Sequence, residues 1–517
     1  MKERVCGENL EPKAVCGSTD LSRRAFIVAA AGATVAAAAL GSRAALASPD
    51  GEIDALDAMG QAELVRTRRA SALELLDACI ARVERVNPQI NAVVSEFLDK
   101  ARATARGNLP QGPLSGVPYL IKDLVGVKGE RETAGCRMLA SFIATDTSPA
   151  ADLAIKAGMV VFGKTNTCEF GLLPNTESLL LGAVRNPWNQ AHSAGGSSGG
   201  AAAAVAAGML PVAHATDAGG SIRIPASCCG VVGLKTSRFR VPNPDPLEGA
   251  PDVEFCVSRT VRDTAMMLSV SEDRRSRAPL KPVGFIAGPN PKRLKIAFCT
   301  QNMFGDEPHS EVKAAVEHSA KLCSSLGHEI VEVKNPIGGE QFFEAFQVVW
   351  ALPAAWAMGE AKKRHLNAAD VLEPWTIGLA QRLASKPKSA VREAVEYFKS
   401  FQRQFEGFMS GFDAALTPVL FSPPPRLGEL SPTVGFETLL SRVREYVSYT
   451  PSHNAAGTPA ISIPLHWTNE GLPVGSQFAA KLGGEDTLLS LAYELEQLQP
   501  WSNKRPLISA SERKTDI

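Results

Sequence analysis

A lysine and two serine clusters are the residues of this chain whose types could carry out chemistry together. Lys122 ends a short apolar run, Ser197 and Ser198 lie among glycines, and Ser221 follows a second pair of glycines. A lysine buried at the end of a strand loses solvation of its charged form, so its pKa falls. The neutral amine can then act as a general base towards a serine without any histidine. The combination indicates nucleophilic acyl transfer.

The glycines before Ser221 add a second element of that chemistry. Gly219 and Gly220 have no side chain, so the backbone can approach a substrate closely. Consecutive N–H groups left free at such a turn can stabilise an oxyanion. Taken singly, each piece has a plainer interpretation: Gly-Gly-Ser is commonly a turn, and a lysine at a strand end is commonly a surface charge.

Two other glycine motifs compete for the chemistry and are rejected on physical grounds. Residues 158–165 match the phosphate-loop expression, but their middle residues, Met-Val-Val-Phe, favour a strand where that loop needs a flexible cradle of N–H groups. Residues 195–199 match the G-x-S-x-G nucleophile elbow. An elbow follows an apolar strand, whereas the residues before this one are polar and irregular. We therefore expect a helix, a turn and a strand at the first motif, and no Ser-His-Asp hydrolase at the second.

Composition places the chain among globular proteins and excludes several classes. The 517 residues are 45% hydrophobic and carry 54 basic and 54 acidic side chains, so the net charge is zero. A nucleic-acid-binding protein normally shows a basic balance or patch, so no nucleic-acid partner is expected. There is no HExxH or paired CxxC motif, so no metal or other cofactor is indicated. The adjacent Cys228 and Cys229 are predicted to be buried free thiols, because a disulfide between neighbours is strained.

The first residues have the pattern of an export signal. Arg23 and Arg24 stand before an Ala-rich apolar run at residues 25–40, and residues 45–47 offer a small-x-small cleavage site. The run is 16 residues long, shorter than the ~20 needed to span a bilayer as a helix. Residues 1–47 are therefore predicted to be a twin-arginine signal peptide, and 48–517 the mature domain. That domain is expected in the periplasm or outside the cell, without a stable membrane anchor.

The remaining pattern is that of an α/β protein. Residues 52–86 predict two helices, the second opening with a capping box at Ser71 and Glu74. Residues 340–450 read as helical, with little motif content. Further elements are predicted as strands at 117–121, 159–162, 294–298, 329–333, 460–464 and 474–478, and as helices at 201–209, 310–326 and 485–498.

At this point the chain resembles the amidase signature family over residues 52–502. The residues that carry the resemblance are the two Gly-Ser segments with 225–235 after them, and segments 163–170, 186–189 and 454–464. The resemblance implies a single large α/β domain with a mixed, twisted central sheet covered by helices. It also implies a Ser-Ser-Lys triad with Ser221 as nucleophile, Lys122 as base and Ser197, held by a cis peptide in that family, as the proton relay.

The resemblance implies further roles around the triad and no cofactor. The backbone N–H groups of the oxyanion hole would be those of Ala218, Gly219, Gly220 and Ser221. Supporting rather than catalytic roles would fall to Ser198, Asp217 and Arg223. The expected reaction is attack on an amide carbonyl, release of ammonia or an amine, and hydrolysis of the acyl-enzyme.

The substrate is left open by the sequence. Residues 211–218 and Pro500-Trp501 most resemble the 6-aminohexanoate cyclic dimer hydrolases of the family. The expected substrate is a small-molecule amide with an apolar or aryl acyl group; the alternatives are a cyclic or linear oligoamide, an aryl acylamide and a carbamate. Pocket candidates in 340–450 are Trp350, Trp356 and Trp375, although aromatic residues at such spacing are more often core. A second copy of the chain, in a homodimer, is the one protein partner that is considered.

Overall fold

The structure is a computed structural model and describes residues 53, 56–242, 252–276 and 278–510. The predicted signal peptide, residues 1–47, lies outside the described residues. Within the described part, no helix is long and apolar enough to cross a membrane.

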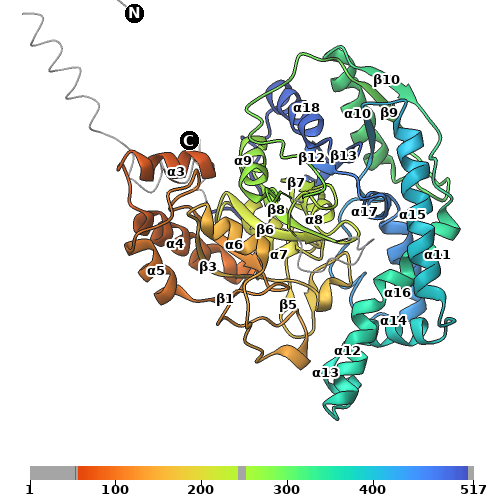
Figure 1. Ribbon diagram of the computed structural model, residues 1–517, viewed down its shortest axis with the longest axis horizontal. Helices are drawn as coiled ribbons and strands as arrows, with labels where there is room; N and C mark the ends of the chain where they lie inside the picture. The colour runs from red at the N-terminus through yellow and green to blue at the C-terminus, as the bar shows by residue number, and fades with distance from the viewer. Residues whose placement is uncertain (1–52, 54–55, 243–251, 277, 511–517) are drawn as a thin grey trace, which may run out of the picture. The chain divides into compact units, whose positions relative to one another are not determined.

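Strands form a large mixed sheet, a smaller sheet and a short ribbon (Figure 1). The large sheet has eight strands in the order β10-β9-β11-β13-β12-β7-β8-β6, and the small one has three in the order β1-β3-β2. Strand β9 runs parallel to both β10 and β11, while the other pairs of the large sheet are antiparallel. The strands are β1 (Val93–Glu96), β2 (Pro118–Lys122), β3 (Val160–Thr165), β4 (Glu177–Ser178), β5 (Gly182–Ala183), β6 (Val212–Asp217), β7 (Val232–Lys235), β8 (Val253–Ser258), β9 (Lys295–Phe298), β10 (Glu329–Glu332), β11 (Ala414–Pro418), β12 (Ala460–Trp467) and β13 (Pro473–Ala480).

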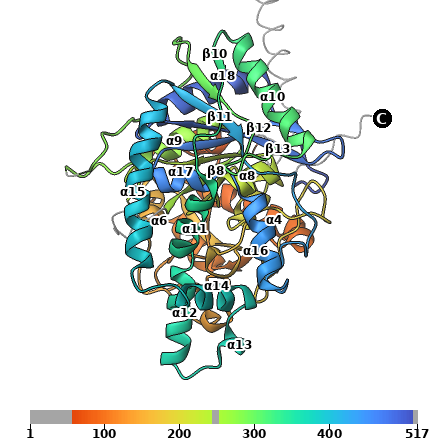
Figure 2. The same cartoon turned by 90° about the vertical axis from the view of Figure 1, so that its right-hand side faces the viewer.

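Helices surround the sheets, and α12, α13 and α14 lie together at the end opposite β10 (Figure 2). The helices are α3 (Ala58–Arg66), α4 (Ala72–Ile90), α5 (Leu98–Arg106), α6 (Pro149–Lys156), α7 (Gly199–Ala206), α8 (Arg223–Cys229), α9 (Val261–Ser271), α10 (Ser310–Ser325), α11 (Gly339–Trp350), α12 (Leu352–Lys363), α13 (Ala368–Val371), α14 (Pro374–Ala384), α15 (Ala390–Met409), α16 (Phe436–Tyr446), α17 (Pro451–Ala456) and α18 (Glu485–Leu498). Short 3₁₀ turns occupy Arg137–Leu139 and Glu169–Gly171.

The two sheets meet at their edges, and this meeting creates the site. Strand β2 is an edge of the small sheet, β6 is an edge of the large one, and the two strands pack side by side. Both strands are buried along their whole length. The last residue of β2 is Lys122 and the last of β6 is Asp217, so the loops that follow these strands lie next to the junction.

Local sequence explains the elements that hold this junction. Helix α4 begins with the predicted capping box, in which Ser71 and Glu74 each satisfy the other's backbone N–H. Helix α7 is buried at every position, and its run of alanines allows close packing against α8 and β6. It directly follows Ser198, so the rigid helix fixes the C-terminal end of the serine segment.

The predicted fold class is confirmed, and one predicted stretch is wrong in part. Residues 340–450 are largely helical as expected, but they also contain β11, which lies between β9 and β13 inside the large sheet. A short apolar run does not reveal by periodicity whether it forms a strand or part of a buried helix. The other predicted helices and strands are present, with ends that differ by a few residues.

Candidate active site

Lys122 lies in the interior with its amine held by two hydroxyl groups. Its side chain is fully buried, and Nζ donates to Ser197 Oγ at 2.7 Å and to Thr216 Oγ1 at 2.8 Å. Burial is the main cause that lowers the pKa of this amine, to about 7, while Cys168, Asp217 and Glu254 oppose the shift. At neutral pH a large share of Lys122 is therefore unprotonated and able to accept a proton.

The serine segment places Ser197 and Ser198 on different partners. The peptide bond between Gly196 and Ser197 is cis. Gly196 lies against the backbone of Asn175, where an added Cβ would be 2.1 Å from the carbonyl oxygen, so only glycine fits. Ser198 Oγ lies 3.2 Å from both the N–H and the carbonyl oxygen of Thr216. The first serine thus contacts the lysine, and the second ties the segment to β6.

Ser221 lies on the glycine turn between β6 and α8 and is half-buried. Its hydroxyl has no hydrogen-bond partner among the residues that the structure describes. Gly220 before it has φ +138°, a conformation that favours glycine, and a Cβ there would lie 2.4 Å from Thr450 Oγ1. The Gly219 carbonyl accepts from the same Thr450 hydroxyl at 2.6 Å. The turn is therefore held in place, and its Ser221 side chain is half-buried.

One of the four expected oxyanion donors is already engaged. The Gly220 N–H donates to Asp217 Oδ1 at 2.8 Å. No side chain of the described residues accepts from the N–H groups of Ala218, Gly219 or Ser221. These three remain the candidates for binding an oxyanion.

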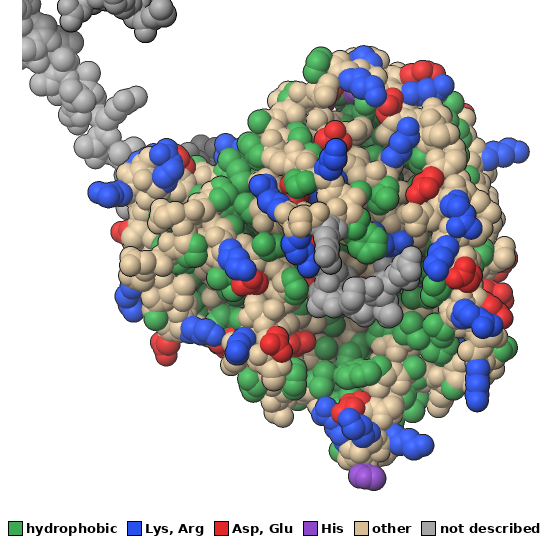
Figure 3. Space-filling view, viewed as in Figure 1, with side chains coloured by type: hydrophobic (Ala, Val, Ile, Leu, Met, Phe, Trp, Pro, Cys, Tyr) green, Lys and Arg blue, Asp and Glu red, His purple; other side chains and the backbone are tan. Residues whose placement is uncertain are grey.

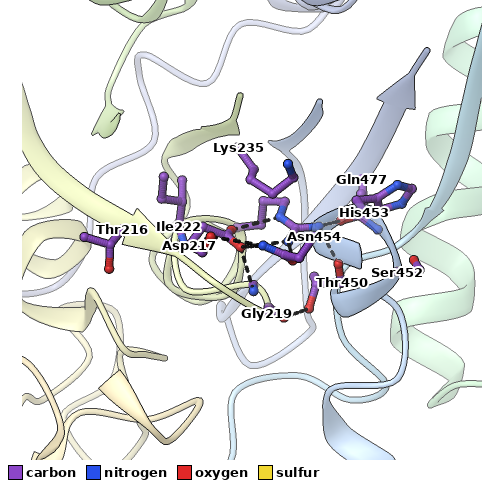
Figure 4. A network of polar contacts seen from close by, with 12 residues as sticks. Thr216, Asp217, Gly219, Ile222, Lys235, Thr450, Ser452, His453, Asn454 and Gln477 are labelled. Carbon is purple, nitrogen blue, oxygen red and sulfur yellow. Dashed lines mark hydrogen bonds and ion pairs between the residues drawn. The ribbon is translucent and has the colours of Figure 1, made fainter. Parts of the chain in front are cut away.

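A buried ion pair between Asp217 and Arg223 holds the two ends of the turn that carries Ser221. Asp217 and Arg223 are both fully buried, with Arg223 Nε 3.0 Å from Oδ2 and an Nη 2.9 Å from Oδ1. Burial alone would raise the pKa of Asp217, but the Arg223 guanidinium outweighs it and holds that pKa well below its ordinary value. Figure 4 shows Asn454 pointing at Asp217, to which its amide donates at 2.8 Å. These contacts are those of supporting residues.

The guanidinium also ties distant elements to the turn. Arg223 donates to Gln477 Oε1 at 2.8 Å, to the Thr450 carbonyl at 2.9 Å and to Asn454 Oδ1 at 2.6 Å (Figure 4). Gln477 comes from β13, and Asn454 from α17. Arg223 has no free N–H directed at a substrate in this arrangement, which agrees with a structural role.

Aromatic side chains form a wall beside the site. Gly219 lies against Phe346, since a Cβ there would be 2.8 Å from the ring. Phe346 contacts Trp350, with ring centroids 5.9 Å apart, and Trp350 contacts Trp375 at 5.6 Å. The Trp375 indole N–H donates to the Leu172 carbonyl at 2.8 Å. Gly171, the residue before Leu172, connects this wall to the site, because a Cβ on it would lie 3.2 Å from Ser197 Oγ.

The three tryptophans predicted as pocket candidates therefore differ. Trp375 is buried, Trp350 is half-buried within the wall, and Trp356 is 54% exposed with its ring edge-on to Phe170. Sequence reasoning gave no role to Thr216, Thr450 or Gln477. One local feature of Thr216 could have been used: it is a polar residue next to Asp217 on one strand, so its side chain projects from the face opposite that of Asp217.

The motifs set aside at the sequence level are structural. Residues 158–165 form the turn after α6 and strand β3, and Lys164 at the end of β3 is buried and donates to the Val125 carbonyl. Cys228 and Cys229 are buried free thiols in α8, as predicted.

Comparison with known proteins identifies the family. The model of the Amidase family matches residues 74–489. The chain belongs to the amidase family. Members of that family hydrolyse amides, and this chain is an enzyme of the same class.

The relatives cover nearly all of the described amidase domain. The chain is 36% identical over 491 residues to 6-aminohexanoate-cyclic-dimer hydrolase of Paenarthrobacter ureafaciens, covering 89% of this chain and 98% of the relative. The solved structure of a 6-aminohexanoate cyclic dimer hydrolase complexed with substrate superposes with a TM-score of 0.82 at 33% identity, over 88% of this chain and 99% of the other. A bacterial aryl acylamidase superposes with a TM-score of 0.78 at 26% identity, over 87% and 99%.

Proposed function

We propose that this amidase hydrolyses a carboxylic acid amide through an acyl-enzyme on Ser221, with Lys122 as base and Ser197 as relay. The observation that carries the proposal is the 2.7 Å hydrogen bond between the buried Lys122 amine and Ser197 Oγ. A neutral amine at the end of a hydroxyl relay can remove a proton from a nearby serine.

The acylation step moves one proton along this relay. Ser221 Oγ forms a bond to the substrate carbonyl carbon and gives its proton to Ser197, whose own proton passes to Lys122 Nζ. The carbonyl π pair becomes a lone pair on the oxygen. When the carbonyl re-forms, the carbon–nitrogen bond breaks and the nitrogen leaves with the proton of Lys122, as ammonia or an amine. Water then cleaves the acyl-enzyme by the same route.

Backbone N–H groups stabilise the negative oxygen in both steps. The donors proposed here are Ala218, Gly219 and Ser221. Asp217 and Arg223 position them by holding the two ends of the turn, and Gly220 donates inward to Asp217. A preorganised donor of this kind is worth roughly 10²–10³-fold in kcat.

The substrate proposed first is an amide with an apolar or aryl acyl group. The wall of Phe346, Trp350 and Trp375 supports it, because aromatic faces favour flat or apolar groups. In the space-filling view, apolar side chains also gather just above the projection at the bottom, where Figure 1 labels α12 and α13 (Figure 3). The large apolar side chains of α12 and its C-terminal loop that are exposed are Trp356 and Leu366.

A second candidate is a cyclic or linear oligoamide. The similarity to 6-aminohexanoate-cyclic-dimer hydrolase favours it, at 36% identity over nearly the whole relative. An aryl acylamide or a carbamate is a further alternative, and the similarity to the bacterial aryl acylamidase supports the former.

The test is release of ammonia or amine by the purified mature protein from matched aliphatic, aryl and cyclic amides. Activity that Ser221→Ala lacks, while its circular dichroism and melting temperature match the wild type, supports the acyl-enzyme. Comparing aryl acylamides with the cyclic dimer of 6-aminohexanoate separates the two candidates. Equal turnover by Ser221→Ala and the wild type contradicts the mechanism.

We also propose that residues 1–47 direct export through the twin-arginine route, so that the enzyme acts in the periplasm or outside the cell. The pair Arg23-Arg24 before the apolar run supports this. Fractionation of cells that express the full chain, beside a variant with both arginines changed to lysine, tests it: the variant should stay in the cytoplasm. The homodimer stays a prediction, and the molar mass of the purified protein from light scattering would test it.

A further inference from the structure

A row of buried polar side chains continues behind Lys122, on strands β6 and β8. In the register of this antiparallel pair, Thr216 faces Glu254 and His214 faces Cys256. Residues directly opposite each other, and residues two apart on one strand, project from the same face. Thr216, which accepts from Lys122, therefore shares its face with Glu254 and His214.

Glu254 and His214 form a buried pair on this face. His214 Nε2 lies 3.5 Å from Glu254 Oε2, and the two side chains are 2% and 9% exposed. Both ring nitrogens of His214 and Glu254 Oε2 have no hydrogen-bond partner among the described residues. A carboxylate left in the interior with so little hydrogen bonding is costly to the fold. Such a cost at this position calls for a functional reason.

The reason lies in the charge that acylation creates. When Lys122 accepts a proton, an ammonium forms on a fully buried side chain, and it needs a negative charge nearby. The groups whose charge favours ammonium at Lys122 are Cys168, Asp217 and Glu254. Burial raises the pKa of the Cys168 thiol to about 12, so at neutral pH it carries no charge. Asp217 is already neutralised by Arg223.

By elimination, Glu254 is the remaining group, because it is a carboxylate that no arginine neutralises. We propose that Glu254, oriented by His214, is the counter-charge that stabilises the ammonium formed on Lys122 when it takes the proton relayed by Ser197. This inference rests on the proposed function, because it assumes that Lys122 is the base. Glu254 is a positioning residue in this scheme: it acts on Lys122 by its charge and accepts no proton.

Other titratable groups surround Glu254 and define the control. Strand β2 contributes Tyr119 and Lys122, β6 contributes His214, and the segment after β2 contributes Glu132. Burial raises the pKa of Glu132 above its ordinary value, although Lys164 opposes the shift. Glu132 is not among the charges that act on Lys122. Glu132→Gln therefore removes a neighbouring carboxylate without removing the proposed counter-charge.

The experiment measures the protonation of Lys122 directly, without any substrate. Protein labelled with [ε-¹³C]lysine is titrated by NMR, and the Lys122 resonance is assigned by its absence in Lys122→Met. In the wild type the midpoint is expected at about 7. In Glu254→Gln it should fall by about one pH unit, because an opposite charge nearby favours the ammonium. Glu132→Gln should leave it unchanged, and Glu254→Asp, which keeps the charge, should restore most of the wild-type value.

An unchanged midpoint in Glu254→Gln overturns the proposal, and so does an equal shift in Glu132→Gln. If Glu254→Gln does not fold, Glu254→Leu replaces the buried polar group with an apolar one of similar size, and the same shift is expected. Because the titration needs no turnover, it separates this inference from the proposed function. A shifted midpoint in a protein inactive on every amide keeps the counter-charge and refutes the activity.

Discussion

Lys122 Nζ donates to Thr216 Oγ1 at 2.8 Å, although the two residues stand 94 positions apart in the chain. The contact crosses from the edge strand of one sheet to the edge strand of the other. It fixes the amine while its second hydrogen bond goes to Ser197. A base held from two sides has its direction set before a substrate arrives, and each of its contacts can be tested.

Loss of the base should be far more damaging than loss of another buried lysine. Lys122→Ala is expected to lower kcat by roughly 10²–10⁴-fold, the usual contribution of a general base. The matched control is Lys235→Met. Burial also lowers the pKa of Lys235 to about 7, but its amine donates to the Thr236 carbonyl. Steady-state kinetics on the best amide should show a control loss below about tenfold; equal losses would remove Lys122 as base.

The rate should depend on pH through Lys122. Below its pKa of about 7 the amine is an ammonium and cannot accept a proton, so kcat/KM should rise with pH through about 7 and then level off. The measurement is kcat/KM from roughly pH 5 to pH 9. The acidic limb should be absent from the residual activity of Lys122→Ala. A limb that persists there unchanged would belong to another group.

Thr216 should matter for orientation of the amine and little for substrate binding. Thr216→Val keeps the shape but removes the hydroxyl bonded to Lys122. Losing a buried hydrogen bond costs about 1–3 kcal/mol, so kcat is expected to fall about tenfold with KM nearly unchanged. Thr216→Ser restores a hydroxyl and should recover most of the rate. A rise in KM at constant kcat would instead place Thr216 in substrate binding.

The buried ion pair should dominate stability at the turn. Arg223→Met leaves Asp217 charged and buried, which is expected to cost about 3–5 kcal/mol of the free energy of unfolding. The control is Arg262→Met, which breaks the pair with Asp57 on a half-exposed arginine and should cost only about 0–1 kcal/mol. Urea denaturation measures both. Similar small losses in the two variants would show that other contacts hold the turn.

Much of the fold and the site could be predicted because the signals are local. The capping box of Ser71 and Glu74 depends on residues three positions apart, and strand β3 within 158–165 follows from its own apolar run. Strand β11 was missed for the opposite reason. Its five residues lie inside a helical region, and only pairing with β9 and β13 makes them a strand.

The sequence by itself determined which residues could react: a lysine ending an apolar run, serines among glycines, and a glycine turn before Ser221. Residue type and short-range spacing carry that information, since glycine and buried lysine have the same physical properties in any fold. The tertiary structure decided which groups meet. It brought Thr216 to Lys122, Asn454 to Asp217, and Glu254 to the rear of the base. These contacts depend on strand register and on the packing of one sheet edge against another, which no local pattern encodes.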